Sequence, residues 1–259
     1  SDLSRMYWEF RRHGENLNSI GAGMAIAVEQ RMKSERLKTE LITNVSHDIK
    51  TPLTSIINYT DLLQRPELTE AERAEYLEVL GRQSRRLKKL TEDLVEASKA
   101  STGNIQTNLA PTNVEELINQ AVAEYSERLQ AGRLEPVVSV ERPDLTALAD
   151  GRLLWRVLDN LLGNAVKYAL AGTRVYLDAR TDGDRVRISV KNISREPLNI
   201  SADELMERFV RGDASRTTEG SGLGLNIARS LTALQQGTFD ITVDGDLFRA
   251  DIRLKPGEA

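Results

Sequence analysis

The sequence contains no cysteine, and its only two histidines are His13 and His47. The lack of cysteine excludes a disulfide framework, a zinc-thiolate site and a thiol nucleophile. Two histidines are also too few for a metal cage built from several imidazoles. Lys and Arg total 35 against 39 Asp and Glu, which leaves a net charge of −4. This near-balance argues against sequence-independent nucleic-acid binding, which draws on a strongly basic face.

Long hydrophobic runs are missing as well. No stretch approaches the ~20 apolar residues that are needed to cross a bilayer. The chain starts at Ser1 rather than at Met, so we expect an excised fragment or a processed start, which is compatible with a membrane anchor upstream. The residues that are present, 40% hydrophobic and 29% charged over 259 positions, are typical of a globular chain with two domains.

The N-terminal half reads as helical. After a break at Pro66, Thr69 and Glu72 form a capping-box start for a second helix. Two long helices and a short turn predict an antiparallel hairpin, and its uncovered flank favours pairing into a dimeric four-helix bundle. Residues 1–36 resemble a coiled-coil lead-in, although periodicity alone also fits a plain structural coiled coil. The apolar stripes expected to be buried are Ile42, Val45, Ile49, Leu53, Ile56, Thr60 and Leu63, and Leu77, Leu80, Ser84, Leu87, Leu90, Leu94 and Ala97.

Beyond a linker at residues 100–104, helical and strand patterns alternate. Together they predict an α/β sandwich of the α+β kind with a mostly antiparallel sheet. The segment 192–222 is long and rich in charge, with one short helical piece near residues 203–209, as in a functional lid. We expect helices at 114–129, 152–169 and 223–234, and strands at 136–140, 146–149, 173–179, 185–190, 238–243 and 248–254.

Three short segments contain residues that can act in catalysis or bind a ligand, and the first segment surrounds His47. At roughly 100° per residue, this histidine lies about 140° from Ile42, so its ring is expected to face solvent, where a nitrogen can attack a phosphoryl group. Asp48 can orient the ring or take its proton. Thr51 shares the same face, and Pro52 is expected to bend the helix. Most isolated His-Asp pairs are ordinary surface residues. A proline in the middle of a helix, however, destabilises the helix by roughly 3 kcal/mol, so Pro52 favours a functional role for this segment.

The second segment is a helix face that carries Asn160, Asn164, Lys167 and Tyr168, at positions i, i+4, i+7 and i+8. Amide oxygens can ligate a hard cation, an ammonium group can meet phosphate charge, and a ring can stack on a base. This face therefore suits a magnesium-bound triphosphate. The alternative is a solvated face with a lone aromatic, but two in-line asparagines are unusual in an otherwise apolar helix.

The third segment is rich in glycine and leads directly into a helix. Glycines let backbone amides approach phosphate oxygens, and the helix N-terminus adds a favourable dipole. Alone this is weak support, since such turns often mark only tight packing, and the context of a dinucleotide fingerprint or a P-loop is missing. In the upstream lid, three arginines can close over a γ-phosphate and Phe209 can anchor the lid by packing. The segment is Gly220, Ser221, Gly222, Leu223, Gly224 and Leu225, and the arginines are Arg208, Arg211 and Arg216.

Taken in order, these segments resemble the H-box, N-box, F-box and G2-box of the sensor histidine kinases of two-component signalling, from about Leu37 to the end of the chain. The resemblance implies a signal-transmitting lead-in over residues 1–36 and a dimerisation and histidine-phosphotransfer hairpin over 37–100. It also implies an ATP-binding catalytic domain of the Bergerat fold over 101–259. The expected partners are a second copy of the chain and a response-regulator receiver domain, with no nucleic acid. The expected location is the cytoplasmic portion of a bacterial inner-membrane sensor.

The resemblance further implies ATP and Mg²⁺ as cofactors and assigns the site residues. His47 would be the phosphoacceptor, Asp48 its general base, and Thr51 would assist dephosphorylation of the regulator. Asn160 and Asn164 would hold magnesium. The other nucleotide contacts would be Lys167 and Arg211 at the phosphates, Tyr168 at the adenine, and Phe209, Arg216, Gly220, Gly222, Leu223 and Gly224 in the lid and the glycine-rich segment.

One position departs from the family pattern. Where the family has Asp-x-Gly-x-Gly, with an aspartate that accepts a hydrogen bond from the adenine amino group, this chain has Lys191, Asn192, Ile193 and Ser194. Asn192 can still accept through its amide oxygen, although a neutral acceptor is weaker than a carboxylate. We therefore expect nucleotide binding to survive.

The sequence thus predicts ATP-dependent autophosphorylation of His47, transfer to an aspartate of a response regulator, and regulator phosphatase activity. Two alternatives remain. One is a conformational ATPase of the same ATP-binding superfamily, although such proteins lack a histidine hairpin ahead of the nucleotide domain. The other is a phosphatase or scaffold with a degenerate nucleotide site, which the missing glycines near Asn192 make credible.

Overall fold

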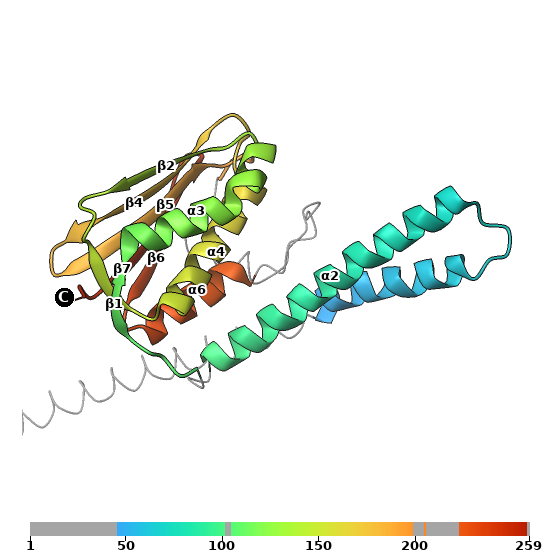
Figure 1. Cartoon of the computed structure of the whole chain (residues 1–259), viewed down its shortest axis with the longest axis horizontal. Helices are drawn as coiled ribbons and strands as arrows, with labels where there is room; N and C mark the ends of the chain where they lie inside the picture. The colour runs from blue at the N-terminus through green and yellow to red at the C-terminus, as the bar shows by residue number, and fades with distance from the viewer. Residues whose placement is uncertain (1–45, 102–104, 199–204, 206–222, 258–259) are drawn as a thin grey trace, which may run out of the picture. The chain divides into compact units, whose positions relative to one another are not determined.

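The computed structural model describes residues 46–101, 105–198, 205 and 223–257 (Figure 1). The expected lead-in over residues 1–36 lies outside these ranges, as do Ile42, Val45 and, apart from Leu205, the helical piece expected near 203–209. No helix in the described part of the chain is long and apolar enough to span a bilayer.

The N-terminal part of the described chain is the predicted helical hairpin, formed by a helix over residues 46–63 and α2 (Glu70–Ser101). The capping box is confirmed, because the Thr69 amide donates to Glu72 Oε2 at 2.9 Å and the Glu72 amide donates to Thr69 Oγ1 at 3.2 Å. The rings of Tyr59 and Tyr76 meet edge to face with centroids 5.4 Å apart, which ties the two helices together near the turn. Helical structure continues without a break through Pro52, whose side chain is buried.

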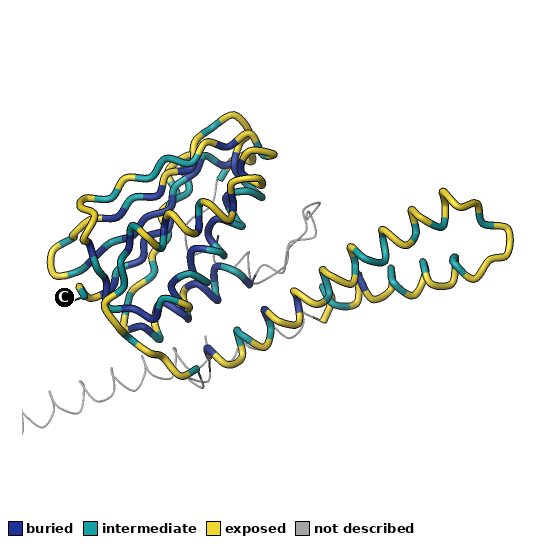
Figure 2. The backbone as a smooth tube through the Cα atoms, in the orientation of Figure 1, coloured by how far each residue is buried: buried dark blue, intermediate teal, exposed yellow. Residues whose placement is uncertain are grey.

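The predicted apolar stripes are only partly covered within the hairpin (Figure 2). Leu90 is buried and Ile49 and Ile56 are half-buried, but Leu53 is 44% exposed and Leu77 55% exposed. The exposed part of these stripes agrees with the expectation that one flank of a single hairpin stays uncovered, and burial of that flank in a dimer stays a prediction. Two helices cover only one flank of each other, so part of each apolar face stays open.

The rest of the described chain forms the predicted α+β sandwich. Its main sheet has the order β2-β4-β5-β7-β6, in which only the β2–β4 pair is parallel, and β1 and β3 form a small antiparallel sheet. The predicted strands and helices are all present, whereas β1 was not predicted. The elements are β1 (Ala110–Asn113), α3 (Val114–Ala131), β2 (Glu135–Val140), β3 (Thr146–Ala149), α4 (Gly151–Tyr168), β4 (Arg174–Asp182), β5 (Arg185–Ile193), α6 (Gly224–Leu234), β6 (Thr238–Asp244) and β7 (Leu247–Leu254).

The core lies between the main sheet and the three helices α3, α4 and α6, which cover one face of the sheet (Figures 1 and 2). Alternate residues of β5 point toward the helices, and Val186, Ile188 and Val190 are fully buried there. Asn192 continues this alternation and is also buried. The opposite face of the sheet is charged, and its side chains form ion pairs such as Lys191–Asp178 at 2.8 Å.

The start of α4 is fixed by Asp150, a buried N-cap. Its carboxylate accepts hydrogen bonds from the amides of Asn108 and Arg152 at 3.0 and 3.1 Å, and the Arg152 guanidinium lies 3.0 Å away. The Asp150 amide in turn donates to Gln235 Oε1 at 3.0 Å, which joins the start of α4 to the end of α6. Burial alone raises the pKa of Asp150, but the hydrogen bonds lower this pKa below its ordinary value.

Replacing Asp150 with Ala is predicted to lower the free energy of unfolding by roughly 1–3 kcal/mol at pH 7, because buried amides lose their acceptor. Since the pKa is depressed in the folded state, this stabilisation is complete above the unfolded-state pKa of about 3.9 and is lost as the pH falls below it. Urea unfolding at several pH values measures the effect. Asp144→Ala, which removes only an exposed ion pair, is the matched control and should change nothing. Equal stability of the two variants would contradict the role of Asp150.

Candidate functional site

His47 stands outward from the first helix of the hairpin, as predicted. Its side chain is 81% exposed, and its Nδ1 lies 3.6 Å from Oδ1 of Asp48. This separation is too long for a hydrogen bond, but it places the carboxylate beside the ring. The other ring nitrogen is Nε2, and an imidazole nitrogen that carries a lone pair can act as a nucleophile.

Thr51 lies one helical turn after the histidine. Its hydroxyl donates to the His47 carbonyl at 3.2 Å, so it is held on the same side of the helix as the ring. The following residue, Pro52, has no amide to donate to the Asp48 carbonyl. His47 and Thr51 thus share one exposed face of the hairpin, and Asp48, whose side chain is 17% exposed, lies beside His47.

In the α/β domain, two of the predicted motifs meet at Asn160. The Asn160 Nδ2 donates to the Arg156 carbonyl at 3.0 Å, which fixes the orientation of the side-chain amide. Its Oδ1 then lies 3.1 Å from the position that a Cβ on Gly224 would occupy. Gly224 is the first residue of α6, and Leu223 before it is buried. The absence of a side chain at residue 224 is therefore what gives the Asn160 amide its room.

The rest of the predicted face lies further along α4. Nδ2 of Asn164 is buried without a hydrogen-bond partner in the described structure, and Lys167 Nζ lies 5.3 Å from the centre of the Tyr168 ring. The N–H groups of this amide can donate to an oxygen of a bound ligand. Two neutral amide oxygens fit Mg²⁺, which keeps most of its ligands as phosphate oxygens and water. The residues present are compatible with a magnesium-bound nucleotide.

The end of α4 is tied to the end of β5. The Leu170 amide donates to the Ile193 carbonyl and the Arg195 amide donates to the Tyr168 carbonyl, both at 2.8 Å. Residues 169 and 194 also form an isolated β-bridge. As a result, Tyr168 and the buried Asn192 lie at the same end of the domain.

Several of the predicted site residues lie outside the described residues. They are Phe209, Arg211, Arg216, Gly220 and Gly222, together with Arg208. The described structure therefore brings together the α4 face, the end of β5 and the start of α6.

Sequence reasoning missed a cluster of charges around Arg156. This side chain contacts Asp93 at 2.8 Å and Glu96 at 2.9 Å on α2, and it also pairs with Asp159 on its own helix. Burial alone lowers the pKa of the guanidinium, but the three carboxylates raise it above its ordinary value. No local pattern in the sequence indicates these contacts with α2, because Asp93 and Glu96 lie about sixty residues before Arg156.

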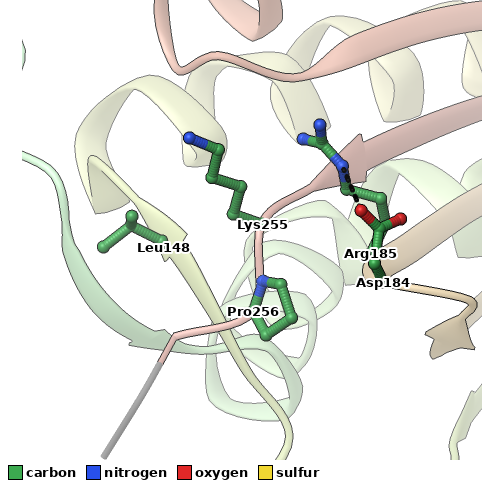
Figure 3. A pocket seen from close by; sticks show the side chains of 5 residues that line it. All are labelled: Leu148, Asp184, Arg185, Lys255 and Pro256. Atoms are coloured by element: carbon green, nitrogen blue, oxygen red, sulfur yellow. Dashed lines mark ion pairs between the residues drawn. The ribbon is translucent and has the colours of Figure 1, made fainter.

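A cavity of about 480 Å³ lies at the other end of the sheet (Figure 3). It is next to the β4–β5 turn, whereas Asn192 lies at the far end of β5. None of the predicted site residues lines it, and the two cations there already bond Gln236. This cavity is therefore separate from the candidate site. Its lining consists of Leu148, Asp184, Arg185, Lys255 and Pro256.

Two family models match the chain. Residues 37–103 match the His Kinase A (phospho-acceptor) domain, and residues 149–256 match the family described as histidine kinase-, DNA gyrase B- and HSP90-like ATPase. Together the two matches cover well over half of the chain. The first includes His47 and the second includes the whole α4 face and the start of α6.

Curated relatives are sensor proteins of bacteria. The sensor histidine kinase GacS of Pseudomonas protegens is 27% identical over 241 residues, which cover 91% of this chain and 26% of GacS. The sensor protein VanSC of Enterococcus gallinarum is 28% identical over 225 residues, which cover 86% of this chain and 62% of VanSC. The chain thus spans only part of the length of these relatives.

Solved structures share the fold. Full-length ShkA in complex with AMPPNP has a TM-score of 0.62 and 29% identity, and the match covers 87% of this chain and 46% of ShkA. The histidine kinase ThkA in complex with the response regulator TrrA has a TM-score of 0.67 and 21% identity, with 88% of this chain and 65% of that chain covered. The second likeness shows the fold alone.

Replacing Gly224 with Ala is predicted to displace the Asn160 amide, because the new Cβ would lie 3.1 Å from its oxygen. We expect the affinity for magnesium-bound ATP to fall about tenfold or more. Gly151→Ala is a matched control, since this glycine is also the first residue of a helix and its Cβ would meet only Thr112, at 3.9 Å. Calorimetric titration of both variants measures the difference. Equal nucleotide affinities would show that the space at residue 224 does not matter for binding.

Proposed function

Because the chain belongs to the sensor histidine kinases of two-component signalling, we propose that it transfers the γ-phosphoryl group of ATP to His47. It then passes this group to an aspartate of a response-regulator receiver domain. The observation that carries the proposal is an exposed imidazole beside a carboxylate in the same chain as the Asn160–Gly224 site. The proposed divisions are a lead-in over 1–36, the phosphotransfer hairpin over 37–100 and the catalytic domain over 101–259.

The proposed first step is an in-line displacement at phosphorus. Nε2 of His47 forms a bond to the γ-phosphorus, the bond from that phosphorus to the β,γ-bridging oxygen breaks, and ADP leaves. Asp48, 3.6 Å from Nδ1, stabilises the positive charge that develops on the ring and accepts the Nδ1 proton as general base. In the second step the phosphoryl group moves from Nε2 to the aspartate oxygen of the regulator. In this proposal Thr51 assists dephosphorylation of the regulator by orienting a water that hydrolyses the resulting acyl phosphate.

ATP binding is proposed at the end of the domain where α4, β5 and α6 meet. The match to an ATPase family supports ATP as the nucleotide. Asn160 and Asn164 would hold Mg²⁺, which supplies charge neutralisation to the phosphates when bound. In this proposal Lys167 and Arg211 contact the phosphates and Tyr168 and Asn192 line the adenine pocket, while the lid and turn consist of Phe209, Arg216, Gly220, Gly222, Leu223 and Gly224.

Two protein partners are part of the proposal. A second copy of the chain is supported by the apolar side chains that the hairpin leaves open, namely Leu53, Ile57 and Leu77. A response regulator is supported by ThkA, a histidine kinase whose structure was solved in complex with one. Since the relatives are longer proteins called sensors, we further propose that the chain acts as the cytoplasmic part of a bacterial membrane sensor.

Replacing His47 with Gln is predicted to abolish the incorporation of acid-labile phosphate from γ-labelled ATP, because the amide has no nucleophilic nitrogen. His13→Gln removes the only other histidine and should keep the label, so it is the matched control. Label on the His47 variant would overturn the assignment of the phosphoacceptor. Release of free phosphate without any protein label in the unmodified chain would favour the conformational ATPase.

Replacing Asn192 with Leu is predicted to remove the preference for ATP over inosine triphosphate, which lacks the adenine amino group. One neutral hydrogen bond is worth about 1 kcal/mol, so the unmodified chain should prefer ATP about fivefold. Competition binding with the two nucleotides measures this ratio, which does not depend on how much stability the variant loses. A preference that survives in Asn192→Leu would place the acceptor elsewhere.

A further inference from the structure

We propose that the cavity at the β4–β5 turn binds a small organic anion, with two cations on the charged group of the ligand and two apolar side chains against the rest of it (Figure 3). The cations are Arg185 and Lys255, and the apolar side chains are Leu148 and Pro256. The cavity volume of about 480 Å³ falls within the range of sites for small organic ligands. This inference concerns the α/β domain alone and does not rest on the proposed kinase activity.

Backbone hydrogen bonds fix the walls of the cavity. The walls come from three segments that are distant in the sequence, namely β3, the β4–β5 turn and the chain that follows β7. The Leu148 amide donates to the Lys255 carbonyl at 2.8 Å, and the Gly257 amide donates to the Thr146 carbonyl at 3.0 Å. A Cβ on Gly257 would lie 3.0 Å from the Cα of Pro111, so glycine allows this close approach. These walls therefore do not depend on a ligand for their shape.

A neutral residue, Gln236, holds both cations. Arg185 Nη1 donates to the Gln236 carbonyl at 3.2 Å, and Lys255 Nζ donates to Gln236 Oε1 at 2.9 Å. Gln236 is itself held at the end of α6, because its amide donates to the Ala233 carbonyl at 2.9 Å. A guanidinium has five N–H groups and an ammonium has three, so each cation keeps further donors for a ligand. Because both cations bond the same residue, they lie near each other.

The positive charge of the two cations is only weakly neutralised within the lining. Asp184 is the one carboxylate among the lining residues, and its side chain is 93% exposed. Its Oδ2 lies 3.9 Å from Arg185 Nε, too far for a hydrogen bond, and exposed pairs of this kind contribute little. Asp182, before the same turn, pairs instead with Arg187 and Arg253, at 3.6 and 3.3 Å. The lining thus carries a net positive charge, which favours a carboxylate or a phosphate group.

The apolar part of the lining favours an organic ion over an inorganic one. Pro256 is placed by an isolated β-bridge to Ala147, and Leu148 is half-buried beside it. In Figure 3 the charged ends of Arg185 and Lys255 lie on the side away from Pro256. A ligand that fills the cavity therefore has a charged group at one end and an apolar body at the other. Both parts add to its affinity, since apolar surface leaves water on binding.

The first test follows the backbone amide signals of the full chain by NMR during titration with phenyl phosphate. We expect saturable shifts at Leu148, Asp184 and Lys255. The affinity is expected to be at least about fivefold higher than for inorganic phosphate, which lacks an apolar part. Benzoate is titrated in parallel, and the tighter binder of the two organic ions identifies the charged group as phosphate or carboxylate.

Two results of this titration would contradict the inference. Shifts confined to Asn160 and Gly224 would place the organic ion on the α4 face instead of in the cavity. Inorganic phosphate that binds the cavity as tightly as phenyl phosphate would show an adventitious ion only, without a site for an apolar body.

The second test repeats the titration with substituted chains. We expect Arg185→Gln and Lys255→Gln each to lower the affinity for phenyl phosphate about tenfold, because each removes a charged donor. Asp184→Asn should raise the affinity at least about twofold, since it removes the carboxylate of the lining. Arg180→Gln is the matched control: it removes one charge from the same β-hairpin, but its guanidinium pairs with Asp178, which does not line the cavity. An equal loss in Arg180→Gln, or unchanged affinity in the other two cation variants, overturns the site.

Discussion

The packing of α4 on the sheet, beside α6, is the constraint on which the rest of the site depends. Leu154, Leu158 and Leu161 are fully buried, so the helix has one rotation about its axis that satisfies its core. That rotation turns Asn160 toward the first residue of α6, where only Gly224 leaves room for the side-chain amide. The polar face of α4 is the side of the helix opposite these leucines. The packing of the leucines therefore also positions the polar side chains.

The charges of the protein act in two different environments. The open face of the sheet carries pairs such as Arg253–Asp240 at 2.6 Å, with the carboxylate 61% exposed, and pairs of this kind contribute at most about 1 kcal/mol. Arg156 instead lies among three carboxylates with little access to water. Removal of one partner from such a group costs about 3–5 kcal/mol, which is why it can fix a contact between α2 and α4.

Local sequence patterns predicted every described element except β1, which is short and contains Pro111, a residue that patterns place outside strands. They also predicted the exposure of His47 and the shared face of Asn160 and Asn164. They placed the end of β5 too early, because charged residues such as Lys191 obscure the alternation. The Arg156 cluster could not be predicted, since Asp93 and Glu96 are about sixty residues away and no periodicity links them to α4.

One helix carries both the Arg156 ion pairs and the proposed nucleotide face, and the two use different parts of residue 156. The guanidinium bonds Asp93 and Glu96 on α2. The backbone carbonyl, which takes no part in these ion pairs, accepts the hydrogen bond that orients Asn160. A substitution that removes the guanidinium therefore keeps this hydrogen bond, so the orientation of the Asn160 amide does not depend on the ion pairs with α2.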